Sequence, residues 1–61
     1  MEDANAKFLK IYADIPDDLR NDIICVIEGK TYTWNTSYIE IKDNTTLGNK
    51  ILKALQAIGI I

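Results

Sequence analysis

The sequence predicts a small α+β domain that occupies residues 1–61 as a single unit. Two segments, 3–13 and 45–58, carry apolar residues at the three-to-four-residue spacing of amphipathic helices. Between them, residues 22–34 hold two runs rich in β-branched and aromatic side chains, separated by a Glu-Gly pair that can form a tight turn. We therefore expect an N-terminal helix, an antiparallel β-hairpin and a C-terminal amphipathic helix.

The N-terminal helix should begin after Asp3, a suitable N-cap, and end before Pro16, because the residue before a proline disfavours the α conformation. Its predicted core-facing arc comprises Ala4, Phe8, Ile11, Tyr12 and Ile15, with Leu9 at the edge. Residues 15–22 are expected to form a turn or one short helical turn, in which Pro16 suits the first helical position and Asp17 and Asp18 favour a helix N-terminus.

The hairpin prediction depends on the apolar run at 23–27. This run also fits helical spacing, but its β-branched content and the Glu28–Gly29 turn favour a strand. In the returning strand, Tyr32 and Trp34 alternate with threonines, which is typical of a strand buried on one side. We expect Trp34 to be largely buried and structural.

Residues 34–43 fit two structures. As a third strand, the segment would direct Ile39 and Ile41 inward, and its Thr, Ile and Tyr content favours this alternative. As a short helix it would align Trp34, Tyr38 and Ile41 on one side and leave Ile39 on the flank. The helix is slightly favoured because it keeps both aromatic side chains on the core side.

The C-terminal helix has the clearest pattern, with Thr45 or Thr46 as its N-cap. Its predicted apolar stripe consists of Leu47, Ile51, Leu55 and Ile58, broadened by Gly48, Leu52 and Ala54. The glycine at position 48 should allow another helix to approach closely, or else it weakens the first turn. Gly59 is the expected left-handed residue of a Schellman ending, in which Ile60 folds back towards Leu55.

Composition argues against several classes of protein. The net charge is −2, and residues 1–22 carry six acidic against three basic residues, whereas a general nucleic-acid binder needs a basic surface. The first residues are acidic and are not followed by an apolar stretch, so we do not expect a signal peptide. The longest apolar run has five residues, too few to span a membrane. We expect a cytoplasmic protein.

The residues that usually carry catalysis or bind metals are scarce. There is no His, and the single Cys25 lies inside an apolar run, where a thiol is most often an inert core residue. The four aspartates of segment 14–22 lack the spacing of a calcium loop, and no glycine-rich phosphate-binding loop is present. We expect no catalytic, cofactor or metal site, and therefore no enzyme.

The sequence favours a non-enzymatic protein-interaction module that forms a homodimer. A chain of this length gains little more from apolar burial than it loses in conformational entropy, and a second copy would shift that balance. The candidate interaction surface comprises Ile58, Ile60 and Ile61, three isoleucines in the last four residues, together with Tyr38. The alternative is a small nucleic-acid-associated regulator that uses Lys50 and Lys53 of the last helix.

Overall fold

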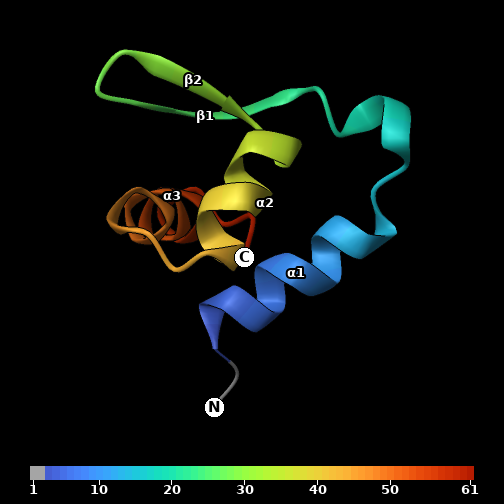
Figure 1. Cartoon of the computed structure of the whole chain (residues 1–61), viewed down its shortest axis with the longest axis horizontal. Coiled ribbons are helices and arrows are strands. Elements are labelled where there is room, and N and C mark those ends of the chain that lie inside the picture. The colour runs from blue at the N-terminus through green and yellow to red at the C-terminus, as the bar shows by residue number, and fades with distance from the viewer. Residues whose placement is uncertain (1–2) are drawn as a thin grey trace.

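The structure, a computed structural model, describes residues 3–61 (Figure 1). Its elements are α1 (Ala4–Asp14), the 3-10 helix η1 (Asp17–Leu19), β1 (Ile23–Ile27), β2 (Lys30–Thr33), α2 (Trp34–Lys42) and α3 (Thr46–Ala57). Within the described residues, three α-helices accompany a two-stranded antiparallel sheet, so the predicted α+β class is confirmed.

The first helix begins and ends where the sequence predicts. The Asp3 side chain accepts a hydrogen bond from the Asn5 backbone N–H at 3.2 Å. At the other end, Ile15 is the C-cap and has an extended backbone, as expected for a residue before Pro16. Phe8 lies fully buried on the inner side of α1.

The hairpin turn consists of Glu28 and Gly29, whose φ angles are 52° and 82°. Positive φ at both central residues defines a type I′ turn, which matches the right-handed twist of the flanking strands. β1 pairs with β2 from the turn to the Ile23–Thr33 pair, and the register is interrupted once, between Ile23 and Cys25. This interruption is a β-bulge that leaves Ile24 without a partner.

The segment that fits two structures is a helix, α2, and it begins with a capping box. The Thr33 hydroxyl accepts from the Thr36 N–H at 3.2 Å, and the Thr36 hydroxyl accepts from the Thr33 N–H at 2.8 Å. Trp34 is therefore the first residue of α2. The prediction that Trp34 shares a strand with Tyr32 is wrong, because β2 ends at Thr33. The partly buried ring of Trp34 packs against Phe8, with the centroids 5.7 Å apart.

The last helix begins at Thr45, whose hydroxyl accepts from the Gly48 N–H at 2.9 Å. It ends in the predicted Schellman motif: the Ile60 N–H donates to the Leu55 carbonyl at 3.0 Å and the Gly59 N–H to the Gln56 carbonyl at 3.2 Å. The predicted place of Ile58 in the apolar stripe is wrong. Ile58 is the C-cap at the edge of the stripe, and it is 62% exposed.

The core lies between the helices and not under the sheet alone. Its buried apolar residues are Phe8 of α1, Ile41 of α2, and Ile51, Leu52 and Leu55 of α3. The hairpin adds only partly buried residues to this cluster. Figure 1 shows the hairpin lying across one side of α2 and α3, with its other side turned away from the rest of the chain. No other part of the described chain covers that side of the sheet.

Candidate interaction surface

The uncovered side of the hairpin carries an apolar surface that we call the outer face, formed by Ile23, Val26, Thr31 and Thr33. Ile23 is paired with Thr33 and Val26 with Thr31, and directly paired residues of antiparallel strands direct their side chains to the same side. Ile23 is 59% and Val26 61% exposed. No charged residue belongs to this face.

The bulge explains why two apolar residues share the outer face. Residues three apart in a regular strand, such as Ile23 and Val26, point to opposite sides of the sheet. The unpaired residue Ile24 shifts the alternation, so that both side chains lie on the side of the threonines. The Cys25–Tyr32 pair is left on the opposite side, where both residues pack against the core.

The end of the hairpin nearest η1, which we call the base, is acidic. It carries Asp17, Asp18 and Asp22 against one cation, Arg20, a net charge of −2. Arg20 Nη1 lies 2.9 Å from Asp17 Oδ1, so the unpaired charges are the exposed carboxylates of Asp18 and Asp22.

The opposite end of the hairpin, the tip, is basic. It consists of the turn residue Glu28, the adjoining Lys30 and Lys50 of α3, a net charge of +1. Lys50 Nζ lies 3.2 Å from Glu28 Oε1 and so joins α3 to the turn. Lys30 is paired with Ile27 and therefore lies on the side of the Cys25–Tyr32 pair, and Lys50 belongs to α3. The two cations of the tip thus do not lie on the outer face.

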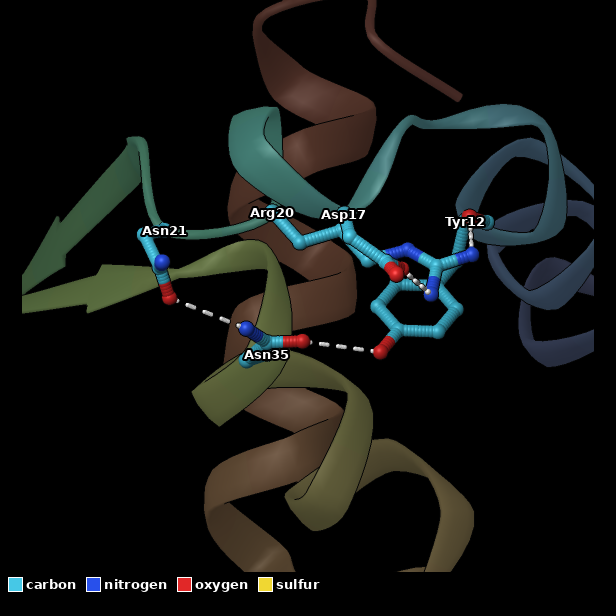
Figure 2. Close-up of polar contacts among 5 residues, drawn as sticks. All are labelled: Tyr12, Asp17, Arg20, Asn21 and Asn35. Atoms are coloured by element: carbon cyan, nitrogen blue, oxygen red, sulfur yellow. Dashed lines mark hydrogen bonds and ion pairs between the residues drawn. The ribbon is translucent and has the colours of Figure 1, made fainter.

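A partly buried arginine holds the base in position (Figure 2). The Arg20 side chain is largely buried, Nη2 donates to the Tyr12 carbonyl oxygen at 3.1 Å, and the guanidinium carbon lies 4.2 Å from the centre of the Tyr12 ring. Arg20 Nε is buried with no hydrogen-bond partner. Stacking on an aromatic ring compensates in part for the lost hydration of a guanidinium.

Two asparagines extend this connection to α2, as Figure 2 shows. The Tyr12 hydroxyl donates to Asn35 Oδ1 at 2.8 Å, and Asn35 Nδ2 donates to Asn21 Oδ1 at 3.1 Å. The Asn35 backbone N–H also donates to the Arg20 carbonyl at 3.1 Å. These bonds join α1, the loop before β1 and the first turn of α2, so the base of the hairpin is fixed to both helices.

Cys25 lies on the inner side of the hairpin and faces α2. Burial raises the pKa of the Cys25 thiol, and the nearby Ser37 side chain lowers it by a smaller amount. Ser37 is fully buried, and its Oγ has no hydrogen-bond partner among the described residues. The contact between Ser37 and the thiol therefore falls short of hydrogen-bond geometry. A raised pKa keeps the thiol protonated at neutral pH, which does not suit a nucleophile.

The four residues predicted as an interaction surface differ in exposure. Ile58 is exposed, whereas Ile60 and Ile61 are partly buried against the core of their own chain. Tyr38 is also partly buried: its ring stacks on Tyr12 with 4.3 Å between the centroids and 7° between the planes. Most of this predicted surface is therefore engaged within the domain.

The outer face and the Arg20 contacts were not identified from the sequence. The bulge that brings Ile23 and Val26 together has no recognisable signature within the apolar run. The Tyr12–Asn35 bond joins residues 23 positions apart, and it requires α2 to be a helix. The aspartates around Arg20 predict only a turn or one short helical turn, and not the contacts that Arg20 makes.

Across residues 3–61, no three or more His, Cys, Asp or Glu side chains are grouped so as to hold a metal ion, and no pocket is found. The helices of this part of the chain are too short or too polar to cross a bilayer. Comparisons with protein-family models, with curated proteins and with solved structures gave no match to this chain.

Proposed function

We propose that this chain is a non-enzymatic protein-interaction domain that associates with a second copy of itself. The supporting observation is the balance between buried and exposed apolar side chains. Among residues 3–61, the buried core has five apolar residues, while six large apolar side chains are at least 37% exposed. A domain of this size buries a smaller share of its unfolded surface than a larger domain does, so a partner that covers some of the exposed residues adds appreciably to its stability.

The position of the exposed residues matters more than their number. Leu9, Ile39 and Ile58 belong to three different segments, and isolated apolar residues are ordinary on protein surfaces. Ile23 and Val26 are instead on the same side of an uncovered two-stranded sheet. Helices α2 and α3 cover the other side of this sheet, and a second copy would cover the side that carries Ile23 and Val26.

The experiment is sedimentation velocity combined with light scattering over a concentration series. We expect a reversible monomer–dimer equilibrium in the range from about 1 μM to about 1 mM, the range of small interfaces. A single monomeric species throughout that range would contradict self-association.

We place the domain in the cytoplasm. The support is the free thiol of Cys25, since reducing compartments keep single cysteines unpaired. The distribution of the tagged protein after cell fractionation tests this assignment.

A nucleic-acid-associated regulator is the second candidate, favoured by one observation on α3. Its exposed residues include Asn49, Lys50, Lys53 and Gln56, and the helix has no acidic residue. Lysine contacts phosphate, and Asn and Gln side chains can bind base edges. However, Lys50 is already paired with Glu28, which leaves Lys53 as the cation of this face that has no ion pair with any of residues 3–61.

A further inference from the structure

We propose that the hairpin is a flap that lifts from α3 at its turn, Glu28–Gly29, while its base stays attached to α1 and α2. The ion pair between Glu28 and Lys50 is the latch that holds the flap closed, and lifting the flap uncovers the thiol of Cys25. This inference goes beyond self-association and does not depend on it, because the latch joins two segments of one chain.

The base is the firmly attached end of the hairpin. Helix α2 begins at the residue after β2, so no linker separates the strand from the helix (Figure 1). The Trp34 N–H donates to the Asp22 carbonyl at 3.3 Å. The Asn35 N–H donates to the Arg20 carbonyl at 3.1 Å, and Arg20 in turn contacts Tyr12 of α1. These bonds keep the base in place when the turn moves.

The turn is attached to α3 through side chains that water reaches. Lys50 Nζ lies 3.2 Å from Glu28 Oε1, and the side chains of Lys50 and Glu28 are 51% and 78% exposed. An exposed ion pair contributes little to stability and is weakened by salt. At Gly29, no atom lies within 4 Å of the place that a Cβ would occupy. The turn is therefore held more weakly than the base.

The apolar contacts of the hairpin permit this movement. Its side chains that pack on the core include Cys25, Ile27 and Tyr32, and all three are only partly buried. The buried apolar residues belong to the helices. The free energy of burial is roughly proportional to the apolar area removed from water. Lifting the turn therefore requires less free energy than unfolding the whole chain.

Cys25 makes the movement measurable. It is the single cysteine of the chain, it is paired with Tyr32 on the inner side of the hairpin, and it is partly covered when the flap is closed. Thiol reagents react with the thiolate, and burial raises the pKa of the Cys25 thiol. The closed form is thus protected by its cover and by its low thiolate fraction. Opening removes both, so the labelling rate follows the population of the open form.

The first test measures the rate at which N-ethylmaleimide labels Cys25 in latch variants. Glu28→Lys and Lys50→Glu each replace attraction by repulsion, so each should speed labelling by about two- to fivefold. The double variant forms the ion pair in the reverse direction and should label at close to the wild-type rate. In about 1 M salt, where exposed charges are screened, the differences between the variants should shrink.

Lys53→Glu is the matched control for the latch. Lys53 is exposed on the same helix and forms no ion pair with any of residues 3–61. This variant has the same change of charge as Lys50→Glu, so it should label within about 1.5-fold of the wild-type rate if the effect comes from the latch. Labelling of every variant at two protein concentrations shows whether self-association contributes to the rate.

The second test asks whether the base stays attached when the flap opens. No pocket is found among residues 3–61, so a label on Cys25 should hold the flap open. Trp34, the single tryptophan of the chain, lies at the base with its ring against Phe8. We therefore expect the labelled protein to keep its Trp34 emission and its helical circular dichroism. In urea, the labelling rate should rise less steeply than the rate of global unfolding, because lifting exposes little surface.

The outcomes separate the parts of this inference. Equal labelling rates in the wild type and both single latch variants overturn the latch, and so does a double variant that labels as fast as the single ones. If a charge reversal prevents folding, Lys50→Ala takes its place, because it removes the ion pair without placing like charges together. Loss of the native Trp34 emission on labelling overturns the attached base. Sedimentation that shows only monomer overturns the proposed function and leaves this inference standing.

Discussion

Gly48 lies against the end of α2 so closely that a Cβ atom at this position would be 2.5 Å from the Glu40 carbonyl oxygen. The same carbonyl is bound by the next helix, since Thr45 Oγ1 lies 3.2 Å from it and 2.8 Å from Glu40 Oε1. Asn44, with φ of 56°, makes the turn between the two helices. The corner between α2 and α3 therefore requires a residue without a side chain at position 48.

Replacing Gly48 by Ala should destabilise the protein despite the better helix propensity of alanine. Propensity alone would add about 1 kcal/mol of stability. The added methyl group collides with a backbone carbonyl that cannot rotate away, so we expect a net loss of about 2–3 kcal/mol. Urea denaturation measures this change in the free energy of unfolding. Gln56→Ala, at an exposed position of the same helix, should change stability by less than about 0.5 kcal/mol.

A substitution in the hairpin turn should instead increase the stability of the protein. Glu28 has φ of 52°, a conformation that Asn adopts more readily than Glu, and the Asn-Gly pair is the preferred type I′ turn. Glu28→Asn should stabilise the protein by roughly 0.5 kcal/mol, even though it removes a surface ion pair of similarly small value. Gly29→Ala, at φ of 82° with open space around it, should cost about 1 kcal/mol. If the Glu28→Asn protein is less stable than the wild type, the lost ion pair with Lys50 outweighs the gain from the Asn-Gly turn.

Trp34 should be a structural residue. Its ring is packed against Phe8 and partly shielded from water, so Trp34→Ala should cost about 3 kcal/mol in the free energy of unfolding. Ile39→Ala on the exposed side of the same helix is the control and should cost far less. A Trp34→Ala protein of normal stability that no longer self-associates would instead assign Trp34 to the interface.

The raised pKa of Cys25 makes stability depend on pH at the alkaline end. The folded state holds the thiol proton more tightly than the unfolded state does. Stability should therefore be constant below the pKa of an unfolded cysteine, about 8.5, and should fall as the pH rises from there to the folded pKa. Comparison with Cys25→Ala over the same pH range isolates this effect, because that variant lacks the thiol. Identical pH profiles would contradict the prediction.

Nucleic acid should not be bound tightly at physiological salt. Two lysines on α3 give a slope of only about −2 in a log–log plot of affinity against salt, and Lys50 is already paired. Titration of labelled duplex and single-stranded oligonucleotides at about 150 mM salt, a physiological ionic strength, measures the binding affinity. Saturable binding tighter than about 1 μM would favour the regulator over the interaction domain.

The elements with a clear period were predictable from the sequence. The apolar spacing and caps of α1 and α3 placed both helices to within one or two residues, and Glu28–Gly29 placed the turn. The segment at 34–43 was ambiguous because its β-branched residues favour a strand, while the signal for a helix is a single Thr-x-x-Thr capping box.

Features that depend on distant residues were not predictable. Ile58 fits the stripe of α3 by spacing alone, but the Schellman ending turns the chain at that point and directs Ile60 to the core instead. The Arg20, Tyr12 and Asn35 contacts depend on three elements meeting, and the outer face depends on where one bulge occurs. Periodicity describes one element at a time, whereas these features arise between elements.

The location of the core in the helices has a consequence for how the molecule opens. The five buried apolar side chains come from α1, α2 and α3, and the strands contribute only partly buried ones. The hairpin can therefore separate from the helices at a lower free energy than the cost of global unfolding. In native-state hydrogen exchange, the amides of Ile23–Ile27 should lose protection before those of Ile51–Leu55.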